Sequence, residues 1–111
     1  MTISNEPGYY EEGQFGIRVE TVCVTVEADT DHHFAGRKFC KLETVTMTPM
    51  KTNLIDLDLL DDGELDWLNS YHAQVRQSLQ PLMAQLFPES LDFLVSETEP
   101  LLRTKKRKLV E

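Results

Sequence analysis

The chain has 111 residues, of which 41% are hydrophobic and 27% are charged, and its formal net charge is -8. These values are ordinary for a single globular domain with a modest core. No apolar run approaches the roughly 20 residues of a membrane helix, and the first residues lack the basic and apolar regions of a signal peptide. We therefore expect no membrane partner and a cytoplasmic location.

The basic residues are concentrated at the C-terminus. Residues 103–108 hold five of the eleven Lys and Arg, which leaves six basic against eighteen acidic residues in 1–102, a net charge of -12. A body of that charge repels phosphate backbones, so nucleic acid is not an expected partner. We favour a solvated, disordered basic tail at residues 103–111 over a nuclear-localisation or polyanion-binding patch.

The two cysteines, Cys23 and Cys40, are separated by 17 positions and do not form a CxxC pair. In a cytoplasmic protein this spacing favours reduced thiols over a disulfide or a metal site. We expect both thiols to be buried.

The first half of the chain is predicted to form about three mostly antiparallel strands. The clearest covers residues 16–26, which are dense in β-branched side chains. Residues 39–50 form a second long strand that we expect to pair with it antiparallel. Between them, residues 27–38 are polar and contain glycine, which predicts a hairpin loop.

Glu6 lies at the end of a short predicted strand at residues 2–6. Pro7 cannot donate to a sheet and Gly8 readily takes a positive φ, so the pair predicts a sharp turn after Glu6. Residues 9–15 are then expected to be a tight connection. The turn would present the Glu6 carboxylate at a strand tip.

Glu20 falls on the same predicted strand face as Val22, Val24 and Val26, because side chains alternate along a strand. A carboxylate on an apolar face needs an ion pair, hydrogen bonds or a metal ion. Arg18, two positions earlier on that face, is a candidate ion-pair partner, so these residues alone do not require a metal.

The His32-His33 pair lies in the predicted loop. Neighbouring side chains of an extended chain point in opposite directions, so the two rings are not expected to bind one metal ion. We interpret the pair as part of a solvated loop.

The second half is predicted to be helical. Residues 53–60 are expected to cross and anchor on the core, and Asp61 or Asp62 is the expected N-cap of a long amphipathic helix. Its apolar stripe recurs at spacings of three and four. The stripe comprises Leu65, Leu68, His72, Val75, Leu79, Leu82 and Leu86, with Trp67 and Tyr71 beside it.

Proline residues punctuate this helical half. Pro81 predicts a kink or a break near residues 77–80, because it lacks a backbone donor and clashes with the preceding turn. Pro88 suits the first turn of another helix, which should end near Pro100 with Leu91, Leu94 and Val95 facing inward. His72, within the stripe, is expected to be packed and hydrogen-bonded rather than a metal ligand.

Four segments together resemble a known family. The run EPGYY at 6–10, GIRVE at 16–20, NLID at 53–56 and WLNSYH at 67–72 are similar to the C-terminal part of the aminopeptidase P (Xaa-Pro aminopeptidase) family. The latter two resemble the extension of its cytosolic eukaryotic-type members. The resemblance covers residues 1 to about 100 in one order.

The resemblance implies an α+β fold that is the C-terminal portion of a pita-bread fold, about three mostly antiparallel strands followed by helices. Residues 1–50 would be the last strands of the catalytic domain and residues 51–102 a helical C-terminal extension. The complete enzyme would be a cytoplasmic homodimer that hydrolyses the bond between an N-terminal residue and proline. Its substrates would be peptides with proline at the second position.

The family holds two divalent metal ions, usually manganese, with two aspartates, a histidine and two glutamates. By the match, Glu6 would bind one ion and take the proton of the attacking water, and Glu20 would bridge both ions. Arg18 and Tyr10 would orient these carboxylates from the second shell of the site. Carboxylate oxygens suit manganese.

The chain also departs from the family pattern. The other three metal ligands lie upstream of the EPG glutamate in the family, and only five residues precede Glu6 here. Thr21 stands where family members commonly carry Asn or Asp. We therefore expect this chain alone to be inactive, a C-terminal fragment of the enzyme.

An alternative is a non-catalytic binding or dimerisation module derived from that fold. It is suggested by the heptad-like stripe from Leu65 to Leu86, which could pack against a second chain. The competing interpretation, which we favour, is that the stripe packs against the chain's own sheet.

Overall fold

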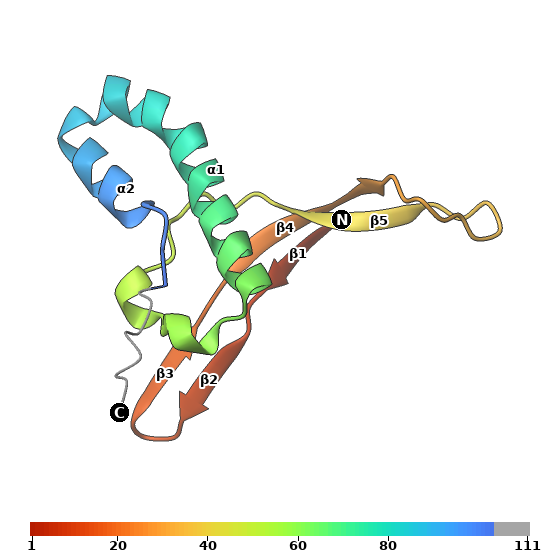
Figure 1. Ribbon diagram of the computed structural model, residues 1–111, viewed down its shortest axis with the longest axis horizontal. Coiled ribbons are helices and arrows are strands. Elements are labelled where there is room, and N and C mark those ends of the chain that lie inside the picture. Colours follow the sequence, from red (N-terminus) through yellow and green to blue (C-terminus); the bar gives the residue numbers. More distant parts are fainter. Residues whose placement is uncertain (104–111) are drawn as a thin grey trace, which may run out of the picture. The chain divides into compact units, whose positions relative to one another are not determined.

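The computed structural model describes residues 1–103 of the chain (Figure 1). Of the predicted basic tail, only Arg103 belongs to this part, and residues 104–111 lie outside it. The chain divides into two compact units, which meet in sequence between Thr46 and Met47. The first unit contains the strands and the second contains the helices, so the predicted α+β class is confirmed.

The first unit contains two antiparallel sheets. In the three-stranded sheet the order is β1-β4-β5, and the predicted pairing of the two long strands is confirmed as β4 with β5. The strands are β1 (Thr2–Asn5), β2 (Gly8–Glu11), β3 (Phe15–Arg18), β4 (Thr21–Ala28) and β5 (Phe39–Thr44).

The segment after Glu6 differs from the expected turn and tight connection. Gly8–Glu11 is strand β2, which pairs with β3 to form a hairpin, and the positive φ of +71° belongs to Gly13 at the hairpin turn. Gly8 instead leaves room for an aromatic ring, because a Cβ atom there would lie 2.6 Å from the Tyr10 hydroxyl oxygen. The Gly8 prediction was wrong because glycine serves close approach as well as turning.

The predicted long strand at 16–26 is divided in two. β3 ends at Arg18 and β4 begins at Thr21, so Val19 and Glu20 belong to neither strand. In β4 the buried side chains are Thr21 and Cys23, and the valines on the other face are only half-buried. Glu20 therefore lies in a break between strands and not on a valine-covered strand face.

The second cysteine is also placed differently from the prediction. Cys23 is buried in β4, but Cys40 is exposed on β5, which lies at the edge of the sheet. Both are free thiols, as expected. β5 ends at Thr44, six residues before the predicted end of the strand.

The second unit contains the predicted long helix. Asp61 is its N-cap: its side chain accepts from the Glu64 backbone N–H, and the Glu64 side chain accepts from the Asp61 N–H, both at 2.8 Å. The elements are the 3-10 turns η1 (Thr52–Leu54), η2 (Leu57–Leu59) and η3 (Pro88–Ser90), and the helices α1 (Asp62–Leu86) and α2 (Leu91–Glu97).

Pro81 lies inside α1, where the sequence predicted a kink or a break near residues 77–80. The helix does not break there but continues to Leu86, and Figure 1 shows it bending along its C-terminal half, which agrees with the kink alternative. The segment predicted to anchor on the core does so only in part: Leu54 and Leu59 are exposed, whereas Ile55, Leu57 and Leu60 are half-buried. The proline at the start of the second helical segment, Pro88, is as predicted.

The core of the second unit lies between α1 and α2. Tyr71, Val75 and Leu94 are buried together, and partly buried side chains pack around them: Met47, Met50, Leu79 and Met83. The stripe of α1 is thus engaged in packing within its own unit from Leu68 to Leu79. Only its last members, Leu82 and Leu86, are exposed, which weakens the stripe as evidence for a dimerisation module.

Candidate functional site

One arginine connects the two glutamates that the sequence singled out. Arg18 Nη1 lies 3.3 Å from Glu6 Oε2, and its Nη2 lies 3.2 Å from Glu20 Oε2. Glu6 directly follows β1, Arg18 ends β3, and Glu20 lies between β3 and β4. The Arg18–Glu20 ion pair expected from the sequence is confirmed, and the contact with Glu6 is additional.

Backbone pairing explains why these side chains meet. The antiparallel pairing of β2 with β3 continues past its end, because the Val19 N–H donates to the Pro7 carbonyl at 3.0 Å. The same chain segments pair again as β1 and β4, with Asn5 opposite Thr21. Both glutamates therefore sit at the gap between the two sheets, on facing chain segments.

Tyr10 is the fourth member of this group. Its ring lies against Gly8 and Gly16, since a Cβ atom at Gly16 would be 2.7 Å from the ring. The pKa of Arg18 is raised, first by the charge of Glu20, then by Tyr10 and Glu6, and also by a hydrogen bond with Tyr10. Arg18 therefore stays charged and keeps both carboxylates beside it.

The group is open to solvent. The Glu6 and Glu20 side chains are each 44% exposed and Arg18 is 48% exposed, so the ion pairs are screened and add little to stability. Ser4 donates from its hydroxyl to Glu6 Oε1 at 2.7 Å, which orients that carboxylate further.

The donor set suits a hard divalent cation but is incomplete. Carboxylate oxygens are the ligands that manganese and magnesium prefer, and these ions take about six. Within residues 1–103, no group of three or more His, Cys, Asp or Glu side chains is placed to hold a metal ion. Glu6 and Glu20 thus offer two oxygen-donor side chains of the type such an ion prefers, and the described residues do not assemble a complete metal site around them.

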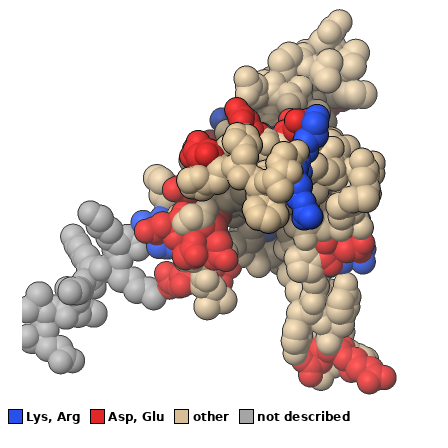
Figure 2. Space-filling view, turned by 90° about the vertical axis from the view of Figure 1, so that its right-hand side faces the viewer, with Lys and Arg blue, Asp and Glu red and all other residues tan. Residues whose placement is uncertain are grey.

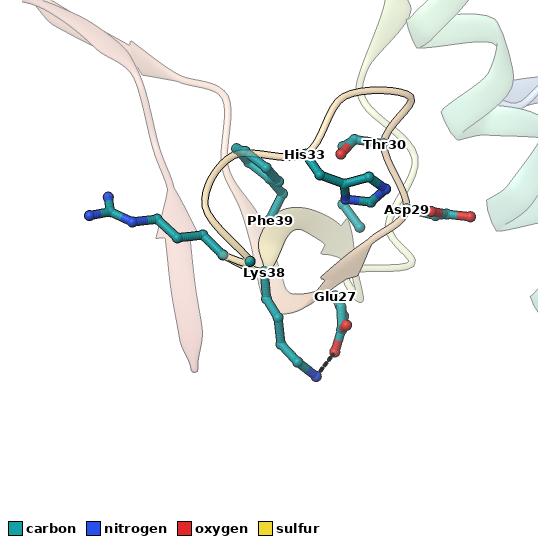
Figure 3. A pocket seen from close by; sticks show the side chains of 9 residues that line it. Glu27, Asp29, Thr30, His33, Lys38 and Phe39 are labelled. Atoms are coloured by element: carbon teal, nitrogen blue, oxygen red, sulfur yellow. Dashed lines mark hydrogen bonds and ion pairs between the residues drawn. The ribbon is translucent and has the colours of Figure 1, made fainter.

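The three histidines lie away from this group in the sequence. His32 and His33 are on the β4–β5 loop, where His33 lines a hollow of about 460 Å³ (Figure 3). Lys38 and Glu27 form an ion pair of 2.8 Å at that hollow, whose residues all come from one exposed hairpin. His72 is fully buried and accepts a hydrogen bond from the Met50 N–H at 3.1 Å, as expected for a packed histidine.

The surface carries its carboxylates in clusters. Figure 2 shows acidic side chains at the tip of the β2–β3 hairpin, where Glu11 ends β2 and Glu12 begins the turn. Among the described residues, no helix is both long and apolar enough to cross a membrane.

Comparison with known proteins adds the following. The family described as the C-terminal region of peptidase_M24 matches residues 38–101. A probable Xaa-Pro aminopeptidase P of Coprinopsis cinerea is 44% identical over 91% of this chain, and the match covers 16% of that protein. Aminopeptidase P1 of Arabidopsis thaliana is 43% identical over 91% of this chain and 15% of the relative.

A solved structure is similar as well. It is the X-prolyl aminopeptidase from Caenorhabditis elegans, described as a cytosolic enzyme with a di-nuclear active site. It superimposes with a TM-score of 0.80 at 30% sequence identity over 90% of this chain and 16% of that chain. The chain therefore spans about a sixth of the length of the proteins it matches.

Proposed function

The chain belongs to the family of peptidase_M24 C-terminal regions, and from this we propose that it is the C-terminal part of a metal-dependent Xaa-Pro aminopeptidase. The complete protein would hydrolyse the bond between an N-terminal residue and a following proline. Residues 1–50 would complete its catalytic domain, and residues 51–102 would be the helical extension. We place it in the cytoplasm, as a homodimer.

The observation that carries this proposal is the convergence of Glu6 and Glu20 on one cation, Arg18. Two carboxylates on facing segments can share a pair of metal ions in the same way that they share a guanidinium. In this proposal Glu6 and Glu20 would together help to hold the metal ions, and Glu6 would also accept the proton of the attacking water. Two bound divalent ions, which we propose to be manganese, would supply an activated water and polarise the carbonyl.

Arg18 and Tyr10 act on this site as positioning residues. Arg18 contacts both carboxylates, at 3.3 Å from Glu6 and 3.2 Å from Glu20, and the Tyr10 ring packs over Gly8 and Gly16 beside it. Contacts of this kind fix the orientation of carboxylates that would bind a metal ion.

The 111-residue chain by itself should be inactive, because it supplies two of the five ligands. Purified chain mixed with manganese and an Xaa-Pro peptide should give no turnover above buffer containing manganese alone. Titration calorimetry should likewise show no manganese binding tighter than the millimolar range. Robust turnover would contradict the assignment of an incomplete site.

The full-length polypeptide provides the positive test. Glu20→Gln should lower the amount of bound manganese, measured by atomic absorption. It should also lower the rate of Xaa-Pro hydrolysis by at least about 100-fold. Glu12→Gln, at an exposed carboxylate in the turn between β2 and β3, is the matched control and should leave both unchanged. Full metal content in the Glu20 variant would remove this residue from the site.

A further inference from the structure

The first residues of the second unit are tied to its helices at three successive points. Tyr71 donates from its hydroxyl to the Thr48 carbonyl at 2.7 Å, and the Met50 N–H donates to His72 Nε2 at 3.1 Å. Lys51 then pairs with Glu97 of α2 at 2.5 Å. Residues 48–51 directly follow the boundary between the two compact units. These three contacts therefore fix the position of the segment that connects the strands to the helices along the chain.

The middle attachment depends on the protonation state of a histidine. Because His72 Nε2 accepts from the Met50 N–H, this nitrogen carries no proton, and the neutral ring must carry its proton on Nδ1. Nδ1 is buried and has no hydrogen-bond partner among the described residues. The geometry thus specifies both the charge and the tautomer of a fully buried ring.

The charged groups around the ring are few. Glu97 on α2 is the carboxylate whose field favours protonation of His72, but it is already paired with Lys51. On α1 the ionisable Tyr71 directly precedes His72, and the two ring centroids lie 5.9 Å apart. Burial dominates and lowers the pKa of His72 below its ordinary value of 6.5, against smaller upward contributions from the Met50 backbone contact and from Glu97. The neutral ring is therefore the stable form in the folded chain at pH 7.

We propose that the neutral His72 ring holds residues 48–51 against α1 and that protonation of the ring releases them. We call this arrangement an acid-sensitive latch. A proton added at Nε2 turns the acceptor into a donor that faces the Met50 N–H, another donor, so the hydrogen bond is lost. The imidazolium is also buried without an added partner, so protonation favours release of the segment. This latch does not depend on metal binding or on peptidase activity.

The sign of the pH dependence follows from the direction of the shift. The released state takes up a proton near pH 6.5, whereas the latched state resists it, so the latch is at full strength above pH 6.5 and weakens as the pH falls. The protection of the Met50 amide against hydrogen exchange, corrected for the intrinsic rate, should fall by up to about tenfold for each pH unit below 6.5.

NMR on the 111-residue chain tests this directly. At pH 8 the ring nitrogen shifts of His72 should report the neutral Nδ1–H tautomer, and the Met50 amide should be protected. Between pH 7 and pH 5 that protection should fall while the latched His72 ring is still neutral, and the fall should level off once the latched ring itself is protonated. An Nε2–H tautomer, or Met50 protection that stays constant between pH 7 and pH 5, would overturn the proposal.

Two variants complete the test. His72→Gln offers a non-titrating oxygen acceptor near the position of Nε2, so it should keep the Met50 amide protected and remove the pH dependence. His33→Gln, at an exposed loop histidine, is the control and should behave like the parent chain. Unchanged pH dependence in His72→Gln refutes the latch, and if this variant does not fold, the tautomer and protection of the parent chain decide.

Discussion

Replacing Leu94 by alanine is the sharpest test of the helical unit. Leu94 of α2 is 2% exposed and packs with Tyr71 and Val75 of α1. The change removes the equivalent of about three buried methylene groups, about 2.4 kcal/mol at 0.8 kcal/mol each, and leaves a cavity that costs more. We expect a loss of about 3 kcal/mol in the free energy of unfolding.

The neighbouring residue supplies the control. Phe93 is 62% exposed, so Phe93→Ala should change stability by no more than about 0.5 kcal/mol although it removes a larger side chain. Urea unfolding followed by circular dichroism at 222 nm measures the free energy of unfolding of both variants. In thermal unfolding the Leu94→Ala variant should melt about 15 °C below the parent chain. Equal losses for the two variants, or less than about 1 kcal/mol for Leu94→Ala, would refute the packing of α2 on α1.

Two further variants test the ends and the edges of this core. Asp61→Ala should destabilise the helical unit by about 1 kcal/mol by removing the capping box with Glu64, whereas Asp66→Ala on the exposed face should not; equal effects in urea unfolding would count against the cap. Burial raises the pKa of Tyr71, so the folded chain keeps this phenol neutral where the unfolded chain ionises it. Its stabilising effect is complete below pH 10 and is lost as the pH rises beyond, and Tyr71→Phe should flatten that alkaline decline in thermal unfolding; an unchanged decline would contradict the burial of the hydroxyl beside the Thr48 carbonyl.

Features set by local interactions could be predicted from the sequence. Asp61 followed by Glu64 specifies a helix start through contacts within one turn, and the spacing of Leu68, His72 and Val75 specifies which face of α1 is buried. The ion pair between Arg18 and Glu20 is local in the same sense, since it joins side chains two positions apart. The family resemblance rests on such short runs as well.

Features that depend on which chain segments come into contact could be identified only from the tertiary structure. The pairing of β2 with β3 divided a strand that looks continuous in sequence and placed Glu6 and Glu20 on the same guanidinium. The role of Gly8 as space for the Tyr10 ring depends on a side chain from the same hairpin that folds back over it. Propensity and periodicity describe one segment at a time, so they do not predict which segments or side chains come into contact.

The sequence by itself determined the classes of element, the start of the long helix and the identity of the two glutamates. Only the tertiary structure decided that Glu6 and Glu20 converge on Arg18, that Cys40 is exposed at a sheet edge, and that His72 accepts from Met50. The physical reason is that charge, periodicity and capping act within a few residues. Burial and convergence, by contrast, depend on long-range pairing, which is specified only when the whole chain is packed.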